Sequence, residues 1–151
     1  MRIGVLSDTH GLLRPEVLPA LAGCEHIFHA GDVGDPAILD ALRTIAPVTA
    51  IRGNTDTHGP CAQLPETEFI PLAGRHFYLI HALAYIRLSP AAAGICCVIS
   101  GHTHSPETHS RSGVLYLNPG SCGPRRFSLP VTLSILEVTE DALTPQLIHL
   151  I

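Results

Sequence analysis

Five apolar segments of this chain each end in a small residue or tight turn, followed at once by a side chain that can bind a metal ion. Such apolar runs are typical of buried strands. In an open α/β sheet the carboxyl ends of the strands border the functional crevice, so side chains on several such ends can meet. The pattern therefore predicts one shared site. The five polar ends are Ser7-Asp8-Thr9-His10, Gly31-Asp32, Gly53-Asn54-Thr55-Asp56, Ile80-His81 and Ser100-Gly101-His102-Thr103-His104.

Expected strands and helices alternate in the first half of the chain. A second helix is expected to begin at Asp35-Pro36, because Asp35 can cap it and Pro36 suits the first helical position. Pro19 should kink or shorten the first helix. This alternation predicts a parallel α/β layer. The expected strands are residues 1–6, 26–29 and 47–51, and the first helix is residues 14–23.

The second half is expected to contain mostly strands. Little helix is predicted there beyond a short piece within residues 83–93, and Gly74 suits a hairpin turn. Two stacked sheets with flanking helices fit this order of elements. The six further strands are expected at residues 68–71, 75–80, 96–100, 114–117, 131–138 and 146–150.

Size and composition favour a single domain over residues 1–151. A chain of this length can bury roughly two thirds of its unfolded surface, and the sequence has no repeat or dividing linker. Hydrophobic residues make up 46% and charged residues 15%, which excludes intrinsic disorder. The formal net charge of −4 argues against a broad nucleic-acid surface, so we expect no nucleic-acid partner.

The distribution of apolar residues predicts a cytoplasmic protein without a membrane partner. The first apolar run ends after Leu6, too early for a signal peptide, and no stretch offers about 20 predominantly apolar residues. The five cysteines lack a CxxC spacing, which favours ordinary free thiols over redox or zinc-thiolate roles. The low charge content leaves a homo-oligomer open as an alternative to a monomer.

The donor types at the five strand ends suit divalent metal ions. Carboxylates, an amide oxygen and imidazoles are ligands for Mn²⁺, Fe²⁺, Zn²⁺ or Ni²⁺, and the lack of a thiolate argues against structural zinc. Ten His stand beside nine Arg and no Lys. Taken singly, each fragment is also typical of an ordinary turn or a packed core histidine. The ordered combination favours a metal site.

These fragments resemble the signature of the calcineurin-like metallophosphoesterases. Two longer fragments, Arg52-Gly53-Asn54-Thr55-Asp56 and Asn118-Pro119-Gly120-Ser121, resemble its small YfcE-type phosphodiesterase branch. The resemblance spans nearly the whole chain, from residue 3 to about residue 150. It implies an α/β fold, the four-layer α-β-β-α sandwich of the metallo-dependent phosphatases, with two metal ions at the sheet edge.

The resemblance also implies roles for seven residues, as metal ligands and catalytic groups. A hydroxide bridging the two divalent ions, which Asp32 also bridges, would attack the phosphorus of a small phosphate ester. The implied protein is a dinuclear metal-dependent phosphoric ester hydrolase, and first of all a phosphodiesterase. Mn²⁺ is the first choice of ion, with Ni²⁺, Fe²⁺ and Zn²⁺ as alternatives. One ion is assigned to Asp8, His10, Asp32 and His104, and the second to Asp32, Asn54, His81 and His102.

Departures from the family pattern bear on the substrate. Thr55 stands where many members carry the His of Gly-Asn-His-Glu, so esters with good leaving groups should react more readily. The loop after His81 is apolar, and only 20 positions separate His81 from Gly101. The helix expected in that interval should therefore be reduced.

Two other functions stay open at this point. One is a catalytically inactive binding scaffold on the same fold, like the retromer subunit that resembles it. The other is a nuclease, although the nuclease relatives carry extra domains and basic surfaces that this chain lacks. Proton donation by His58, substrate contacts by Tyr85 or Arg125-Arg126, and support of the site by His29 also stay open beside ordinary packing or solvation.

Overall fold

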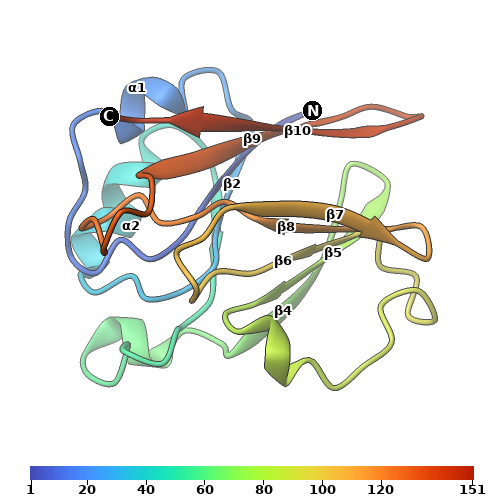
Figure 1. The fold of residues 1–151 in the computed structure, drawn as a ribbon, viewed down its shortest axis with the longest axis horizontal. Helices are drawn as coiled ribbons and strands as arrows, with labels where there is room; N and C mark the ends of the chain where they lie inside the picture. Colours follow the sequence, from blue (N-terminus) through green and yellow to red (C-terminus); the bar gives the residue numbers. More distant parts are fainter.

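The computed structural model describes residues 1–151 and contains two five-stranded sheets stacked on one another (Figure 1). The first sheet has the strand order β10-β9-β1-β2-β3 and the second β4-β5-β6-β8-β7. No helix is long and apolar enough to cross a membrane. The strands of the first sheet are β1 (Arg2–Leu6), β2 (His26–His29), β3 (Val48–Ala50), β9 (Thr132–Val138) and β10 (Leu143–His149). Those of the second are β4 (Thr67–Leu72), β5 (Arg75–Ile80), β6 (Cys97–Ile99), β7 (Glu107–Arg111) and β8 (Val114–Asn118).

Parallel pairing brings the strand ends of each sheet to a common edge. In the first sheet Leu6 of β1 pairs with His29 of β2, which pairs with Ala50 of β3. In the second sheet β5 pairs in parallel with β6, and Leu79 lies opposite Ile99. Because the carboxyl ends are in register, the polar segments that follow these strands leave the sheets side by side.

The outer face of the first sheet is covered by α1 (Val17–Ala20) and α2 (Pro36–Arg43). Asp35 Oδ1 accepts a hydrogen bond from the Ala37 N–H (2.9 Å), so the predicted cap of α2 is confirmed. The helix α1 is much shorter than the predicted residues 14–23. Pro19 lies inside it and cannot donate a helical hydrogen bond, which explains the early end.

The second sheet carries a thinner outer layer. The 3₁₀ helix η2 (Leu83–Tyr85) and the loop after it cover this face, and no α-helix does. A second 3₁₀ helix, η1 (Pro60–Gln63), follows β3. The reduction of the helix between His81 and Gly101 was predicted, and the predicted α/β fold of two stacked sheets is confirmed.

One apolar core lies between the two sheets. Phe28 from the first sheet meets Phe77 from the second with ring centroids 5.4 Å apart, and both are fully buried. A second cluster packs α1 and α2 onto the outer face of the first sheet through residues such as Leu42 and Ile27. At roughly 1.5–3 kcal/mol per buried large side chain, this packing holds the strand ends in place.

All five cysteines are free thiols, and four of them are buried. Burial raises the pKa of the Cys122 thiol to about 12 and also raises that of Cys97. These thiols are therefore protonated and unreactive at neutral pH.

Candidate metal centre

All seven predicted ligand residues gather where the strand ends meet. Asp8 and His10 follow β1, Asp32 follows β2, Asn54 follows β3, His81 follows β5, and His102 and His104 follow β6. The two aspartates are deeply buried: Asp8 has no exposed surface and Asp32 retains 3%. They come from the middle of the first sheet, whereas three of the four histidines come from the second.

Asp8 lies at the centre of the first group of donors. Its Oδ1 is 3.3 Å from Nε2 of His104 and 3.6 Å from Nε2 of His10. The two imidazole Nε2 atoms are themselves 3.2 Å apart. These three side chains can offer ligand atoms that all lie within 4.8 Å of one another, which is the proximity that a bound ion requires.

A second group forms around Asp32 and His81. Nε2 of His81 is 3.2 Å from Asp32 Oδ2 and 3.8 Å from Asp8 Oδ1, so both carboxylates face this imidazole. Asp32 Oδ2 also lies 3.7 Å from Nε2 of His10. Both aspartates therefore lie between the two groups, and the bridging of two ions by Asp32 stays a prediction.

Asn54 and His102 complete the second group at the protein surface. Nδ1 of His102 lies 3.1 Å from Oδ1 of Asn54, and the His102 ring stands edge-on to His81 with centroids 5.2 Å apart. Both residues are exposed. This places them where the buried carboxylates meet solvent, on the open side of the centre.

Three buried polar atoms of the centre have no hydrogen-bond partner: Asp8 Oδ1, His81 Nε2 and His104 Nδ1. An unpaired buried polar atom costs about 1–3 kcal/mol. The Nδ1–H of His81 donates to the carbonyl oxygen of Ala30 (2.7 Å), so Nε2 is the ring atom that faces the two carboxylates. Burial lowers the pKa of this ring, but Asp32, the Ala30 carbonyl and Asp8 outweigh burial and raise it. The space between Nε2 and the carboxylates therefore favours positive charge, which a metal ion can supply.

The charges of the buried groups favour the same conclusion. Burial opposes ionisation of Asp32, but His81 and the Thr55 N–H outweigh it and hold the pKa of Asp32 well below its ordinary value. The pKa of Asp8 is also lowered, because His10, His81 and Ser7 outweigh its burial. Two ionised carboxylates therefore share a buried space, and positive charge must compensate them.

Backbone strain is concentrated in this centre. Eight non-glycine residues have positive φ angles, and five of them are predicted ligands. Such conformations cost of order 1–3 kcal/mol each and persist only where the surrounding structure holds them. Their concentration at one cluster of donors indicates a functional site. The five are Asp8 (57°), His10 (47°), Asp32 (54°), His102 (73°) and His104 (61°).

Two glycines let the loops of the centre pack closely against the ligand side chains. Gly31 has a φ of +100°, and a Cβ added there would lie 2.7 Å from His81 Nδ1. A Cβ on Gly101 would lie 2.6 Å from Asp8 Oδ2. Side chains at either position would therefore push the ligand loops apart.

The sequence reasoning assigned no role to Asp56, yet in the structure it lies between two of the loops that carry predicted ligands. Its buried carboxylate accepts hydrogen bonds from the backbone N–H groups of Gly53 (2.8 Å), Gly34 (3.1 Å) and Val33 (3.2 Å). It therefore fastens the loop of Asn54 to the loop of Asp32. The available signal was its position in the Gly53-Asn54-Thr55-Asp56 fragment, which alone is typical of a turn.

The buried His29 ring lies in contact with the segments that carry Asp8 and Asp32. Support of the site by His29 was one of the possibilities that the sequence left open. Its Nδ1 accepts the Gly31 N–H (3.2 Å), so its Nε2 carries the proton and faces Thr9 Oγ1 (3.0 Å). Thr9 in turn donates to the Val33 carbonyl (2.8 Å). The ring is fully buried, and mainly for that reason its pKa is lowered to about 4.

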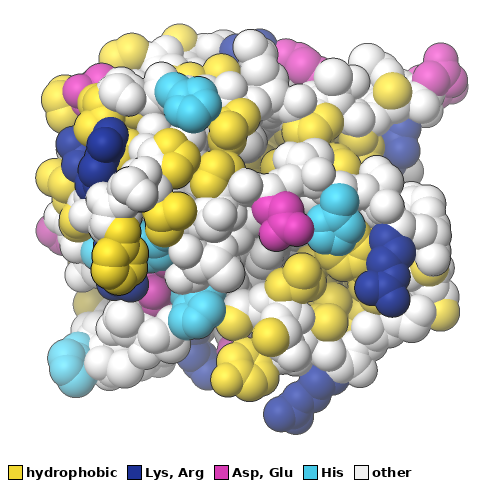
Figure 2. Space-filling view, in the orientation of Figure 1, with side chains coloured by type: hydrophobic (Ala, Val, Ile, Leu, Met, Phe, Trp, Pro, Cys, Tyr) yellow, Lys and Arg dark blue, Asp and Glu magenta, His cyan; other side chains and the backbone are white.

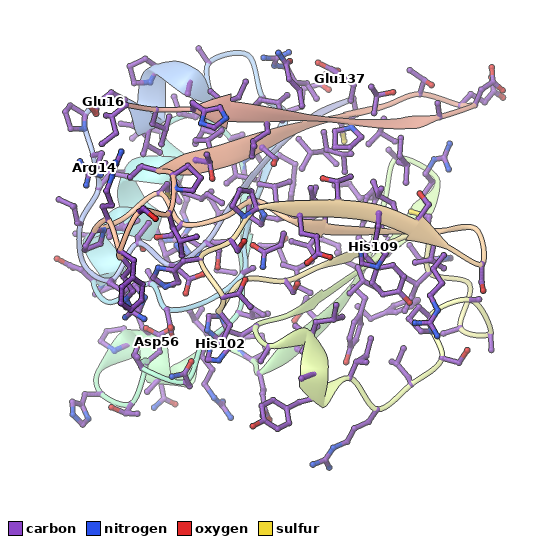
Figure 3. All side chains as sticks on the ribbon, in the orientation of Figure 1. Arg14, Glu16, Asp56, His102, His109 and Glu137 are labelled. Atoms are coloured by element: carbon purple, nitrogen blue, oxygen red, sulfur yellow. The ribbon has the colours of Figure 1, made fainter.

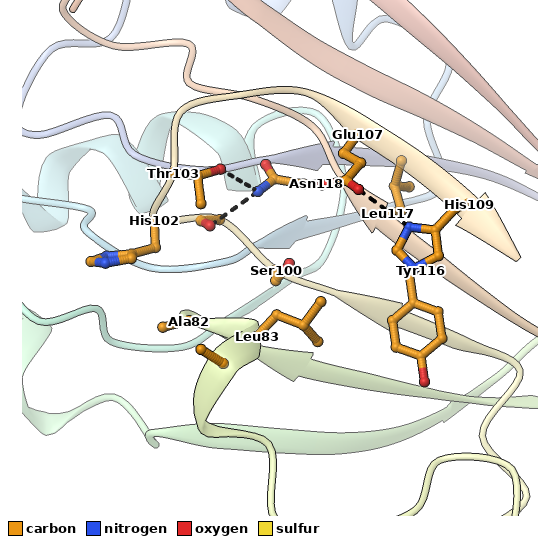
Figure 4. Close-up of a pocket in the computed structure, with 12 residues that line it drawn as sticks. Ala82, Leu83, Ser100, His102, Thr103, Glu107, His109, Tyr116, Leu117 and Asn118 are labelled. Carbon is orange, nitrogen blue, oxygen red and sulfur yellow. Dashed lines mark hydrogen bonds and ion pairs between the residues drawn. The ribbon is translucent and has the colours of Figure 1, made fainter. Parts of the chain in front are cut away.

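Two hollows flank His102. The larger, of about 1040 Å³, is lined by Asn54, Asp56, His81 and His102 and continues along β4 and β5; Asp56 and His102 are labelled in Figure 3. The smaller, of about 120 Å³, lies on the other side of the His102 loop (Figure 4). Asn118 there donates to Gly101 O (3.0 Å) and Thr103 Oγ1 (3.1 Å) and so fixes the loop that carries His102 and His104.

Residues 1–141 match the family model of the calcineurin-like phosphoesterase superfamily domain. A probable metallophosphoesterase of Methanothermobacter thermautotrophicus is 33% identical over 161 aligned positions, which cover 99% of this chain and 92% of that protein. Among solved structures, an archaeal phosphodiesterase is 22% identical with a TM-score of 0.80 and covers 98% of this chain and 100% of its own. Vps29 of Entamoeba histolytica, solved in complex with Zn²⁺, is 23% identical with a TM-score of 0.75 and covers 99% of both chains.

Proposed function

The chain belongs to the calcineurin-like phosphoesterase superfamily, and we propose that it is a phosphodiesterase that hydrolyses small phosphate esters with two divalent ions. One observation carries the proposal: two buried, ionised aspartates face Nε2 of His81, and this nitrogen and Asp8 Oδ1 have no hydrogen-bond partner. An inactive remnant of such a site would gain nothing from retaining uncompensated buried charge.

The seven residues would hold the ions as the family resemblance implies. Asp8, His10, Asp32 and His104 would hold one, and Asp32, Asn54, His81 and His102 the other. Two bound divalent ions acidify a water molecule and neutralise the charge of a phosphate group. Mn²⁺ is the first choice, because the donors are carboxylate, amide and imidazole groups without a thiolate.

The chain's own groups would position the donors and leave one side open to substrate. The Thr55 N–H donates to Asp32 Oδ1 (2.9 Å) and the His102 N–H to Asp8 Oδ2 (3.0 Å), which fixes the direction of both carboxylates. Asn54 and His102 border the large hollow through which a phosphate ester would enter.

The centre offers no obvious acid for the leaving group. Thr55 replaces the histidine of many relatives, and His58 is exposed, with its ring nearest to its own neighbour Thr57 (3.5 Å). Without proton donation, departure of an alkoxide is slow, whereas a group that leaves as a stable anion departs readily. We therefore expect activated diesters to be the best substrates.

The test is a hydrolysis assay on metal-stripped protein reconstituted separately with Mn²⁺, Ni²⁺, Fe²⁺ and Zn²⁺. Bis(p-nitrophenyl) phosphate should be hydrolysed faster than p-nitrophenyl phosphate. Asp32→Ala should abolish turnover, whereas His149→Ala, which removes an exposed histidine of β10, should leave it unchanged. No hydrolysis with any of the four ions would overturn the proposal.

The fold likeness to Vps29 is consistent with a second candidate, a binding scaffold without catalysis. The two candidates differ in what the metal centre must do. A scaffold would tolerate Asp32→Ala without loss of its function, and it would show no metal-dependent turnover. The complete set of donors in this chain favours the enzyme.

A further inference from the structure

Four strands form the edges of the two sheets, β10 and β3 in the first and β4 and β7 in the second. An edge strand exposes unpaired backbone groups, and proteins commonly protect such strands with a proline or by keeping them very short. Pro145 lies in β10, Pro71 lies in β4, and β3 has only three residues. The strand β7 has five residues and no proline, so it is the edge that neither device protects.

The backbone groups of Thr108 and Ser110 in β7 point away from the sheet. In an antiparallel pair of strands, opposite residues alternate between those that exchange hydrogen bonds and those that do not. Leu117 and Leu115 lie opposite these two residues, and they use their backbone groups on their other side, in bonds of 3.1 and 2.9 Å to the residues that flank β6. The N–H and carbonyl groups of Thr108 and Ser110 therefore have no partner within the fold.

The side chains of β7 are all exposed, and three of them form a row on one face of the second sheet. Glu107, His109 and Arg111 are alternate residues of one strand and therefore share a face. The Glu107 carboxylate lies 3.6 Å from Nδ1 of His109 (Figure 4), whereas the ion pairs of the chain's arginines do not include Arg111. Figure 2 shows an acidic, a histidine and a basic side chain in line, in the part of the view where Figure 3 labels His109.

The His109 ring leans back over its own sheet and leaves the edge of β7 open. It stacks on Tyr116 of β8, with ring centroids 5.0 Å apart and an angle of 1° between the ring planes. Tyr116 packs against an apolar cluster that also contacts Leu83 of η2, on the outer face of the second sheet. Because the His109 ring is held over β8, another strand can approach β7 without displacing it.

The sequence of β7 is complementary to itself when two copies run antiparallel. About a twofold axis at His109, Glu107 of each copy lies opposite Arg111 of the other, and Thr108 lies opposite Ser110. Opposite charges on facing residues of neighbouring strands attract one another. Thr108 and Ser110 are also the residues with unpartnered backbone groups, so in this register they exchange hydrogen bonds across the axis. The side chains and the backbone of β7 therefore favour the same register.

We propose that two copies of this chain pair through β7 in this register and join their second sheets into one continuous sheet. A second copy fits the edge better than an unrelated segment, because it carries Glu107 and Arg111 in the order that the charges require. A slip of the pairing by two residues would separate both ion pairs, so the charges also fix the register. The contact is small, and its dissociation constant should lie in the micromolar range or above.

The test is sedimentation equilibrium of the full chain at about 50 mM salt and about pH 8, where the charges are weakly screened and an ordinary histidine is neutral. At protein concentrations of roughly 100 µM and above, the wild type should approach twice the 16.1 kDa mass of one chain. Glu107→Arg and Arg111→Glu each place like charges opposite one another across the axis. Each should therefore raise the dissociation constant at least about 10-fold.

Mixing the two variants separates pairing from folding. One variant carries arginine at both ends of β7 and the other carries glutamate at both, so an equimolar mixture restores both ion pairs and should form a heterodimer. Glu140→Arg, which makes the same change of charge at an exposed residue between β9 and β10, should sediment like the wild type. A wild type that stays monomeric at these concentrations, single variants that dimerise like the wild type, or a mixture that stays monomeric would each overturn the inference.

Discussion

Nε2 of His81 lies 3.2 Å from Oδ2 of Asp32, while the Nδ1–H of the same ring donates to the Ala30 carbonyl oxygen 2.7 Å away. The carbonyl can only accept, so Nδ1 carries a proton, and Nε2 is the atom that faces the carboxylate. Burial lowers the pKa of His81, but Asp32, the Ala30 carbonyl and Asp8 outweigh burial and raise it, so without metal a proton on Nε2 is favoured between the ring and the carboxylate. A metal ion would take the place of that proton and supply more positive charge to the two aspartates, so the folded state should be stabilised by metal.

Added Mn²⁺ should raise the thermal midpoint of the metal-stripped protein by about 5–10 °C. Saturation at 100 times the dissociation constant contributes about 2.7 kcal/mol, and 1 kcal/mol shifts Tm by about 2–4 °C for a chain of this size. His81→Gln should lose at least half of the shift, and His149→Ala should keep all of it. Equal shifts in wild type and His81→Gln would exclude His81 as a ligand.

His29 should make the metal-free protein less stable in mild acid. Its pKa is about 4 when folded, against 6.5 for an ordinary histidine, so between these values the unfolded chain binds a proton that the folded chain does not. Stability is thus lost as the pH falls from about 6.5 towards 4. Between pH 7 and pH 5 this amounts to about 2 kcal/mol.

Urea unfolding of wild type and His29→Gln at both pH values, in the presence of a chelator, isolates this contribution. The variant should lose about 2 kcal/mol less between pH 7 and pH 5 than the wild type does. The same loss in both proteins would show that His29 is protonated in the folded state.

Asp56→Asn should weaken both the fold and the metal centre. One carboxylate now accepts three backbone N–H groups, and an amide has only one acceptor oxygen. We expect a loss of about 1–3 kcal/mol in unfolding free energy and at least about 10-fold in metal affinity.

Asp40→Asn is the matched control for Asp56, because Asp40 is exposed and pairs only with Arg43 on the same helix. It should change stability by less than about 0.5 kcal/mol. Metal titrations of Asp56→Asn that match the wild type would show that the two ligand loops do not depend on this carboxylate.

Thr55→His should widen the range of leaving groups. Thr55 is exposed beside the centre, and its N–H already contacts Asp32, so an imidazole there would lie near the leaving group. General acid catalysis contributes about 10²–10⁴-fold for poor leaving groups and much less for nitrophenolate. The test compares kcat/KM for the deoxydinucleotide d(ApA) with kcat/KM for bis(p-nitrophenyl) phosphate, both measured by product chromatography. The ratio of the first to the second should rise at least about 10-fold in the variant. An unchanged ratio would indicate that the wild-type centre already has an acid for the leaving group.

Much of the centre was predictable because parallel strands carry their polar ends to one edge. Asp8, Asp32 and Asn54 follow three apolar runs whose alternation with helices already indicates parallel pairing, and their convergence follows from that pairing. Strand order and residue type brought the five polar segments to one edge. The choice of seven ligand residues within them came from the resemblance to the calcineurin-like phosphoesterases, and their role as ligands stays a prediction.

What could not be predicted depends on tertiary contacts. The strand Glu107–Arg111 is exposed at all five positions, so it lacks the apolar alternation that marks a half-buried strand. Asp and His adopt positive φ more often than most residues, but residue type alone does not predict that Asp8 and His104 do so here. From the sequence alone, Asp56 is typical of a turn residue. Its role depends on the contact between the two loops that it joins, which the sequence does not reveal.

Metal content per chain tests the central claim most directly. Protein stripped with a chelator, reloaded with Mn²⁺ and freed of excess ion should contain two ions per chain by elemental mass spectrometry. His102→Ala should retain about one, because only the second group loses a donor, and Asp32→Ala should retain fewer than one. Wild-type protein that binds no Mn²⁺, Ni²⁺, Fe²⁺ or Zn²⁺, or that binds them undiminished after Asp32→Ala, would contradict the account.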